Sequence, residues 1–440
     1  MHILKASLTS VVLLSALAAS VEAGNATNIY ADYDYCQGIN PISGKTYEPI
    51  RGAQLQKVQV MMRHGDRTPA TSVLPGDHTN YDICARPAEY TYSAGNRLES
   101  GSPNLRSNIE ISDDNLFAGS FWRGNCELGQ LTNKGSAQTR EVGVALRDIY
   151  INELGFLSKT LNPDDIYLRN TYVWRTRTSA ENFLNGLYPP SHRRRDSVVT
   201  LNTYPQSIET LTLNPTACPK LGVLFTGFFK TPTYLSWYKA NYALITKVNT
   251  VLGVQNNAAF NSSMNGDAIL PRYCNKMPLP CSATNPSLCL TANDVNQVMR
   301  QGFIGYSGAF RYEAAAEQVK RLAAGPFLKT LGGGIRATIS GKSHQRVRPF
   351  EFYSAHDQSL DQVLAVIADP GTPWPAYAST VIFETWRLAN KALVIRVLYE
   401  GKVVPANPNL KCSLSACPIE TFLGFIESYV PKNIVTECSL

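Results

Sequence analysis

Three short apolar runs along the chain have the pattern of buried strands. Residues 57–62 (KVQVMM), 165–170 (DIYLRN) and 350–354 (FEFYS) are rich in β-branched, aromatic and methionine side chains. Each run is shorter than a typical helix and is followed by a polar segment with turn residues. The pattern therefore predicts three strands, each leading into a loop.

Helical periodicity follows these strands. Thr132 is in the position of an N-cap for a helix. Its apolar face carries Val142, Leu146, Ile149 and Tyr150. A second helix is expected around residues 179–187, before Pro189 and Pro190 end it. After the strand at 350–354, apolar residues recur at helical spacing at Leu360, Val363, Leu364 and Ile367.

Repeated strand–loop–helix units predict an α/β fold, with a doubly wound, mainly parallel sheet and helices on both faces. Residues 380–386 and 392–399 add two strands joined by a short turn. From about 225 to 300 the pattern becomes mixed and mostly helical, which indicates a smaller inserted domain. We expect the α/β core to comprise residues 54–70, 128–224 and 301–440, and a cap to comprise residues 71–127 and 225–300.

The first residues have the pattern of a secretory leader. Lys5 gives a positive start, residues 6–20 are small and apolar, and residues 21–23 (Val-Glu-Ala) match a cleavage site after Ala23. A membrane anchor is the alternative, but the apolar run is short for a span. No later segment is apolar enough to cross a bilayer. We therefore expect a protein that is secreted or held in a lumenal compartment, without stable membrane association.

The cysteine count supports that compartment. Ten cysteines, an even number, all lie beyond the leader. They are Cys36, Cys84, Cys126, Cys218, Cys274, Cys281, Cys289, Cys412, Cys417 and Cys438. Disulfides are the expected state in an oxidising compartment, and no Cys-x2-Cys pair supports the zinc alternative. Sequons at Asn25 and Asn261 are candidate glycosylation sites.

The distribution of charge adds little to the prediction of function. The formal net charge of +7 is mild, and the charged residues are scattered except for residues 192–195 (His-Arg-Arg-Arg). That run is either a solvated loop or a patch that attracts anions. Nothing in the sequence resembles a nucleic-acid-binding module.

The segment 63–69 (RHGDRTP) carries the most informative chemistry. Arg63 and Arg67 supply two permanently charged forks that suit a phosphate dianion. His64 lies between them, and Gly65 permits a tight turn. Neighbouring positive charge disfavours the imidazolium, so we expect His64 to stay neutral to unusually low pH, as a nucleophile in acid requires.

This segment resembles the RHGxRxP signature of the histidine acid phosphatases, which share their fold with the phosphoglycerate mutases. A second segment, residues 167–180, is similar to the family's Arg-x-Thr-x-Val-x-Arg-Thr register. The register favours Arg175 over the nearby Arg177 as a phosphate ligand. Tyr172 and Trp174 stand where the family often has acidic or small polar residues, which changes the rim of the site.

Residues 354–358 (Ser-Ala-His-Asp-Gln) look like the family's His-Asp element. The resemblance implies that His356 donates to phosphate and that Asp357 protonates the leaving group, with no metal cofactor. Gln358 departs from the Thr or Asn of many relatives. Cys412 and Cys417 resemble the family's local disulfide, whereas the other eight cysteines cannot be paired from sequence.

The resemblance implies a secreted acid phosphatase that acts on small phosphate monoesters through a phosphohistidine on His64. One alternative is a phytase of the same family, which needs a broad basic cavity. Its candidate cations are Arg193, Arg194, Arg195, Lys342, Arg346 and Arg348. The alternative from another class is a binding protein that has lost activity. His78, His192 and His344 lie in polar segments, and we expect them at the surface.

Overall fold

The computed structural model describes residues 33–38, 46–70, 79–84, 89–91, 104–106, 109, 114–194, 197–254, 265–340 and 347–440. The expected leader and several residues named above lie outside these ranges. They are Asn25, His78, Arg195, Asn261, Lys342, His344 and Arg346.

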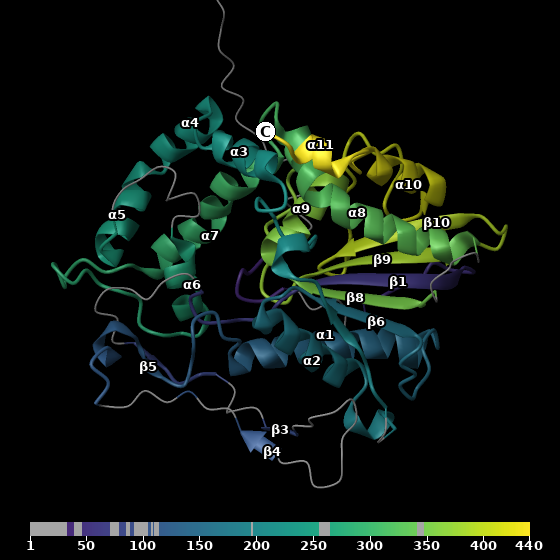
Figure 1. Ribbon diagram of the computed structural model, residues 1–440, viewed down its shortest axis with the longest axis horizontal. Helices are drawn as coiled ribbons and strands as arrows, with labels where there is room; N and C mark the ends of the chain where they lie inside the picture. The colour runs from purple at the N-terminus through teal and green to yellow at the C-terminus, as the bar shows by residue number, and fades with distance from the viewer. Residues whose placement is uncertain are drawn as a thin grey trace, which may run out of the picture.

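The centre of the described structure is an eight-stranded mixed sheet with the order β11-β10-β9-β1-β8-β6-β7, in which β12 also pairs with β10 (Figure 1). The strands are β1 (Gln54–Arg63), β6 (Ile166–Asn170), β7 (Leu201–Thr203), β8 (Phe350–Ala355), β9 (Thr380–Arg387), β10 (Leu393–Tyr399), β11 (Lys402–Val403) and β12 (Cys417–Pro418). Strands β1, β8, β6 and β7 run parallel, whereas β9 and β10 are antiparallel to their neighbours. The predicted α/β fold is confirmed.

Helices cover both faces of this sheet (Figure 1). Helices α1 (Asn133–Arg147) and α2 (Trp174–Leu187) pack on one face, and α8 (Ala316–Ser340), α9 (Asp357–Ile367) and α10 (Ile419–Ser428) pack on the other. Because side chains alternate along β1, Val58, Val60 and Met62 enter the core under α1 and α2, and Met61 enters the opposite core. The apolar run of β1 is explained by burial on both faces.

A second group of helices lies beside the sheet, at the left of Figure 1. It contains α3 (Pro219–Phe228), α4 (Pro232–Ala240), α5 (Tyr242–Leu252), α6 (Gly266–Cys274) and α7 (Ala292–Ser307). Small ladders join β2 (Asn80–Tyr81) to β5 (Arg123–Gly124) and β3 (Glu89–Thr91) to β4 (Asn104–Arg106). A short helix, α11 (Ile434–Cys438), ends the chain. No described helix has both the length and the apolar character needed to cross a bilayer.

Two helix boundaries differ from the sequence prediction. Helix α1 ends at Arg147, and a π-helical turn, Asp148–Glu153, carries the last predicted apolar residues. That turn places the Tyr150 hydroxyl 2.6 Å from the buried carboxylate of Glu384. Helix α2 starts at Trp174, five residues before the expected start at 179, with no side-chain cap that the sequence could reveal.

All ten cysteines form disulfides, which confirms the expected oxidised state and leaves no cysteine for zinc. The pairs are Cys36–Cys274, Cys84–Cys126, Cys218–Cys438, Cys281–Cys289 and Cys412–Cys417. The first three join segments far apart in the sequence. Cys36–Cys274 ties the N-terminal segment 33–38 to the end of α6, and Cys218–Cys438 ties the start of α3 to α11.

The contact between α1 and α2 depends on glycine. A Cβ atom on Gly186 would collide with the backbone of Arg140, and one on Gly143 would collide with the backbone of Phe183. We expect Gly186→Ala to destabilise the protein by roughly 1–3 kcal/mol through overpacking, measured as a fall in Tm. Gly424→Ala on α10 is the matched control, because a Cβ atom there meets no atom within 4 Å. An unchanged Tm in Gly186→Ala would contradict this packing argument.

Candidate active site

The segment 63–69 leaves the C-terminal end of β1 and turns at Gly65 against the first turn of α1. A Cβ atom on Gly65 would collide with the backbone of Gly135, and a Cβ atom on Gly135 would collide with the backbone of Asp66. Glycine at both positions therefore allows the turn to lie directly on the helix. The backbone N–H of His64 donates to Ala355 O at 3.0 Å, which fixes the turn beside the end of β8.

The orientation of the His64 ring follows from one hydrogen bond. Its Nδ1 lies 2.8 Å from the carbonyl oxygen of Gly65. A carbonyl can only accept, so Nδ1 carries the proton and the lone pair of Nε2 is free. Burial, followed by the positive charges of Arg175, Arg63 and Arg67, lowers the pKa of His64 well below its usual value. The ring is therefore a neutral base with an available nitrogen, even in acid.

Arg63 is fully buried and firmly held. Its guanidinium donates to Pro375 O and to the hydroxyl of Tyr35, both at 2.7 Å. It also pairs with Asp357 at 2.9 Å between Nη2 and Oδ2. The rings of Tyr35 and Tyr377 lie 4.8 and 4.3 Å from its Cζ atom. Although burial opposes the charge, Asp357 and the two tyrosines outweigh it and raise the pKa of Arg63 above its ordinary value.

Arg67 and Arg175 differ in their partners. Arg67 pairs with Asp267 of α6, with 2.6 Å between Nη1 and Oδ1, and that carboxylate also accepts from the backbone of Ala70. Arg175, the second residue of α2, makes no hydrogen bond or ion pair with any described residue. Burial and the repulsion of Arg67 lower the pKa of Arg175 to about 10. Arg175 therefore remains charged in acid, without a carboxylate to balance it.

Three residues close to Arg175 in sequence have exposed side chains. Arg177, the competing candidate, has a side chain that is 68% exposed and pairs with Glu181 one turn along α2. Tyr172 and Trp174 are 42% and 44% exposed. Arg175 is thus only partly exposed and lies near His64 and Arg67, with two aromatic residues on the surface beside it.

His356 follows β8 and faces His64, with ring centroids 5.5 Å apart. Its Nε2 lies 2.9 Å from Thr171 Oγ1, and its backbone N–H donates to Ser359 Oγ at 3.1 Å. Burial and the positive charge of Arg175 lower the pKa of His356 well below its usual value. The structure therefore places a second neutral imidazole next to the first.

Asp357 is the first residue of α9. Besides its ion pair with Arg63, its Oδ1 accepts from the backbone N–H of Gln358 at 2.8 Å. Its side chain is 19% exposed, which is more than the side chain of Arg63 or Arg67. The carboxyl group is therefore accessible to water or to a bound molecule.

Three contributors to the site were missed by sequence reasoning. Thr171 holds the ring of His356 and lies in the Arg-x-Thr-x-Val register, so that register could have indicated it. Tyr35 and Asp267 hold Arg63 and Arg67 from segments 28 and 200 residues away. Neither has a local motif, and only the three-dimensional structure brings them to the site.

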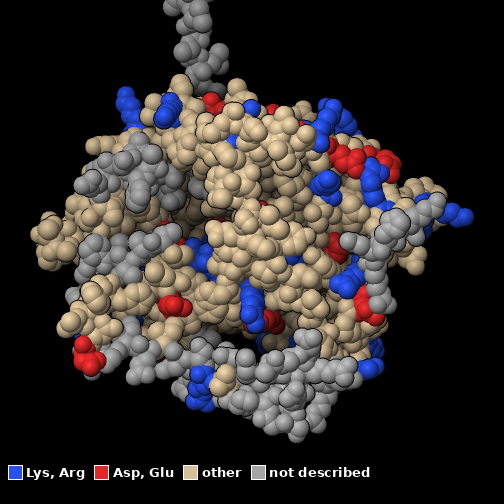
Figure 2. Space-filling view, in the orientation of Figure 1, with Lys and Arg blue, Asp and Glu red and all other residues tan. Residues whose placement is uncertain are grey.

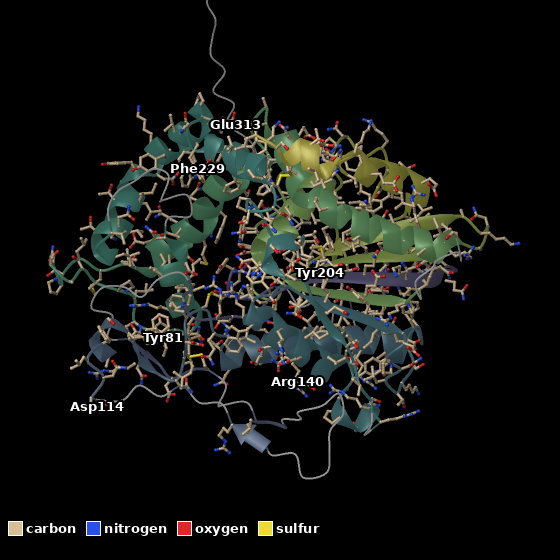
Figure 3. The ribbon with its side chains drawn as sticks, viewed as in Figure 1. Tyr81, Asp114, Arg140, Tyr204, Phe229 and Glu313 are labelled. Carbon is tan, nitrogen blue, oxygen red and sulfur yellow. A yellow bond between two sulfur atoms is a disulfide. The ribbon has the colours of Figure 1, made fainter. Side chains whose placement is uncertain are left out.

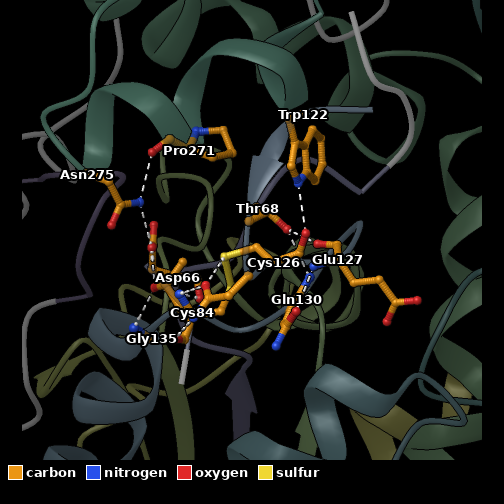
Figure 4. The surroundings of a disulfide bond; sticks show 12 residues. Asp66, Thr68, Cys84, Trp122, Cys126, Glu127, Gln130, Gly135, Pro271 and Asn275 are labelled. Atoms are coloured by element: carbon orange, nitrogen blue, oxygen red, sulfur yellow. Dashed lines mark hydrogen bonds between the residues drawn. A yellow bond between two sulfur atoms is a disulfide. The ribbon is translucent and has the colours of Figure 1, made fainter. Parts of the chain in front are cut away.

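A disulfide supports the second half of the segment 63–69 (Figure 4). Cys84–Cys126 fixes the loop whose Gln130 and Glu127 exchange hydrogen bonds with Thr68. The buried carboxylate of Asp66 accepts from Thr132 at 2.6 Å and from Asn275 at 2.8 Å. These contacts tie the arginine-bearing turn to α1 and to the segment that follows α6.

The described phytase candidates lie elsewhere. Arg193 donates to the carbonyls of Leu184 and Tyr188 at the C-terminal end of α2, the end opposite Arg175. Arg348 precedes β8 and His356 follows it, so the two residues lie at opposite ends of this strand. The molecule is hollowed between the helical group and the sheet, and Lys or Arg side chains are visible at the margin of this hollow (Figure 2).

Comparisons with known proteins identify the family. The family described as histidine phosphatase superfamily (branch 2) matches residues 54–400. Counting factor 60 of Dictyostelium discoideum is 28% identical over 417 residues, 92% of each chain. Human lysophosphatidic acid phosphatase type 6 is 23% identical over 395 residues, 88% of this chain and 86% of the relative. A Hafnia alvei phytase structure with tartrate has the same fold, with a TM-score of 0.57 at 15% identity over 89% of this chain and 100% of the phytase.

The family match spans most of the chain, including both halves of the cluster around His64. The resemblance in the RHGxRxP segment is thereby confirmed at the level of the family. This chain belongs to branch 2 of the histidine phosphatase superfamily and is a phosphatase of that family.

Proposed function

We propose that this chain is a secreted acid phosphatase that hydrolyses phosphate monoesters through a phosphohistidine intermediate on His64. The observation that carries this proposal is the charge balance of the site. The buried Arg63 and the partly buried Arg67 and Arg175 surround a neutral histidine, and among the described residues only Arg63 and Arg67 have a carboxylate partner. A phosphate dianion supplies the negative charge that Arg175 lacks.

The first step uses the free nitrogen of His64. The Nε2 lone pair forms a bond to phosphorus while the bond from phosphorus to the ester oxygen breaks. Asp357 gives its proton to that oxygen, which leaves as an alcohol. The proton stays on Nδ1 and is donated to the carbonyl oxygen of Gly65, which stabilises the positive charge that develops on the ring. The arginines and a hydrogen bond from His356 hold the phosphoryl oxygens.

The second step reverses these roles. The carboxylate of Asp357 takes a proton from water, whose oxygen attacks phosphorus as the bond to His64 Nε2 breaks. Phosphate leaves, and His64 returns to its neutral form. The arginines supply the positive charge that a metal ion provides in other phosphatases, so we propose a metal-independent reaction.

The ion pair between Arg63 and Asp357 explains why the reaction needs acid. In the free site Arg63 forms an ion pair with Asp357. A bound dianion competes for Arg63 and repels the carboxylate, which favours protonation of Asp357. The reaction therefore proceeds at a pH low enough to supply that proton.

The surroundings favour esters with one phosphate and an apolar organic part over phytate. Two of the described phytase candidates, Arg193 and Arg348, lie away from His64, and Tyr172 and Trp174 are exposed beside Arg175. The human relative is named for a lipid monoester of this kind, lysophosphatidic acid. The likeness to the Hafnia phytase supports the fold only.

The compartment follows from the disulfides. Five buried or partly buried cross-links indicate folding in an oxidising secretory compartment. We therefore propose a secreted protein or one held in an acidic lumenal compartment, where the protonated Asp357 is available.

Replacement of the nucleophile tests the mechanism. We expect His64→Ala to lower phosphate release from p-nitrophenyl phosphate by about 10,000-fold or more, while wild type is active in acid with EDTA present. His192→Ala is the matched control and retains activity. Phytate assayed in parallel is expected to be the poorer substrate. Absence of release by wild type from either ester would instead support the inactive binding protein.

Replacement of the acid tests the role of Asp357. We expect Asp357→Asn to lower kcat for β-glycerophosphate by roughly 100- to 10,000-fold. The loss for p-nitrophenyl phosphate is much smaller, because its leaving group departs without a proton. Asp148→Asn, an exposed aspartate on the π-helical turn, is the control. Equal losses for both substrates in Asp357→Asn would refute a role in leaving-group protonation.

Arg175 influences the pH range over which His64 is neutral and can act as a nucleophile. Removing the Arg175 charge stabilises the imidazolium, so the pKa of His64 rises toward its usual value. We expect the acid limb of kcat/KM to move to higher pH in Arg175→Met, and KM to rise by about 10- to 100-fold. Arg177→Met, two residues along the same helix, should change neither. An unshifted acid limb in Arg175→Met would show that Arg175 does not control His64.

A further inference from the structure

A second pocket, of about 710 Å³, opens at the other end of the strands that carry the active site. It is lined by Lys57 near the start of β1, Tyr167 near the start of β6, and Arg348 before β8. His64 and His356 follow the opposite ends of β1 and β8. Seven residues of strand separate Lys57 from His64, or about 23 Å at 3.3 Å per residue. The pocket is therefore distinct from the catalytic site.

Three tyrosines give the pocket aromatic walls. The rings of Tyr167 and Tyr353 are 6.0 Å apart, and both lie on the sheet face that α8 covers in part. Tyr204 follows β7 and adds a third ring, one-third exposed. In Figure 3, Tyr204 is labelled between α8 above it and the pair of α1 and α2 below. The walls thus offer flat apolar surfaces with hydroxyl groups at their edges.

The charge of the pocket is positive. Its lining contains Lys57, Lys329 and Arg348 but one carboxylate, Glu351. That carboxylate is already satisfied, because it accepts from Lys57 at 2.6 Å, Gln59 at 2.8 Å and Tyr353 at 2.8 Å. Lys329 and Arg348 form no ion pair with any described residue. Arg348 instead lies 5.9 Å from the ring of Tyr167. Two cations therefore line the pocket without an ion-pair partner among the residues that the structure describes.

An unexplained glycine supplies an independent observation. Gly333 lies in the interior of α8, where glycine destabilises a helix relative to alanine. A Cβ atom on its neighbour Gly334 would come within 2.7 Å of Gln59 Nε2, so packing requires that glycine. A Cβ atom on Gly333 would meet no protein atom within 4 Å, and Gly333 lines the pocket. Close approach of a bound molecule to the helix backbone accounts for glycine at this position.

We propose that this pocket is a binding site for a small organic anion that carries a planar ring. Lys329 and Arg348 bind the anionic group, and the tyrosine rings stack on the planar part. The open backbone at Gly333 admits the edge of the ring. The volume is that of sites for ligands of this size. The site uses none of the groups assigned to phosphate hydrolysis.

The experiment is isothermal titration of the full chain with 1-naphthalenesulfonate. The compound has no phosphate ester to hydrolyse, and excess inorganic phosphate keeps the catalytic site occupied. We expect binding that weakens by at least about 10-fold in Arg348→Gln and in Gly333→Leu, since each removes one of the two proposed contacts. Methanesulfonate, which has the charge without the ring, and 2-naphthol, which has the ring without the charge, should bind far more weakly.

Controls separate a binding role from a structural one. Lys239→Gln, on the exposed surface of α4, should bind as wild type does. Both pocket variants should keep wild-type activity toward p-nitrophenyl phosphate, which shows that they fold. Gly333→Ala should raise Tm by about 1–2 °C, because no packing opposes the added methyl group. A fall in Tm would show a structural need for this glycine and would remove that part of the argument.

Two results would overturn the proposal. One is no heat of binding for 1-naphthalenesulfonate with wild type at millimolar concentration. The other is equal affinity in wild type and Arg348→Gln, which would place the bound probe elsewhere on the molecule. The second result decides the question even if Gly333→Leu fails to fold.

Discussion

The structure is organised around a concentration of buried positive charge at the carboxyl ends of the parallel strands. Burial of a cation is costly unless a carboxylate or hydrogen bonds compensate for it. Asp357 pairs with Arg63 and Asp267 pairs with Arg67, whereas no carboxylate of the described residues pairs with Arg175. Burial and the repulsion of Arg67 lower the pKa of Arg175 to about 10. An anion that enters the site relieves this imbalance of charge, so the same imbalance that opposes folding favours substrate binding.

Such a cluster can persist only if the surrounding structure prevents its members from separating. The parallel arrangement of β1, β8 and β6 fixes where the three site segments emerge. Glycine contacts then press the turn after β1 onto α1, and the Cys84–Cys126 disulfide fixes the loop that holds Thr68. Tyr35 reaches Arg63 from a segment that the Cys36–Cys274 disulfide ties to α6. Cross-links and helix contacts together resist the mutual repulsion of the arginines.

Local sequence patterns predicted the parts of this structure that are determined by residues close together in the sequence. Short apolar runs gave the strands, and the segment 63–69 indicated a phosphate site because its charges and its turn are adjacent in sequence. Helix α2 began earlier than expected, because no capping side chain marks its start. Tyr35 and Asp267 could not be found in this way, since their roles exist only after distant segments pack together. Thr171 could have been predicted, because it lies in the same Arg-x-Thr-x-Val register that indicated Arg175.

In the proposed mechanism, the pair of Arg63 and Asp357 links substrate binding to proton uptake. The Nη2 atom of Arg63 donates to Tyr35 and also pairs with Asp357, so a phosphoryl group that approaches this nitrogen competes with the carboxylate. A bound dianion therefore weakens the hold of Arg63 on Asp357 and at the same time repels its negative charge. Both effects favour the protonated acid that the leaving group needs. In the proposed mechanism, the requirement for acid is thus a consequence of one shared guanidinium, and an enzyme that uses this mechanism works best in an acidic compartment.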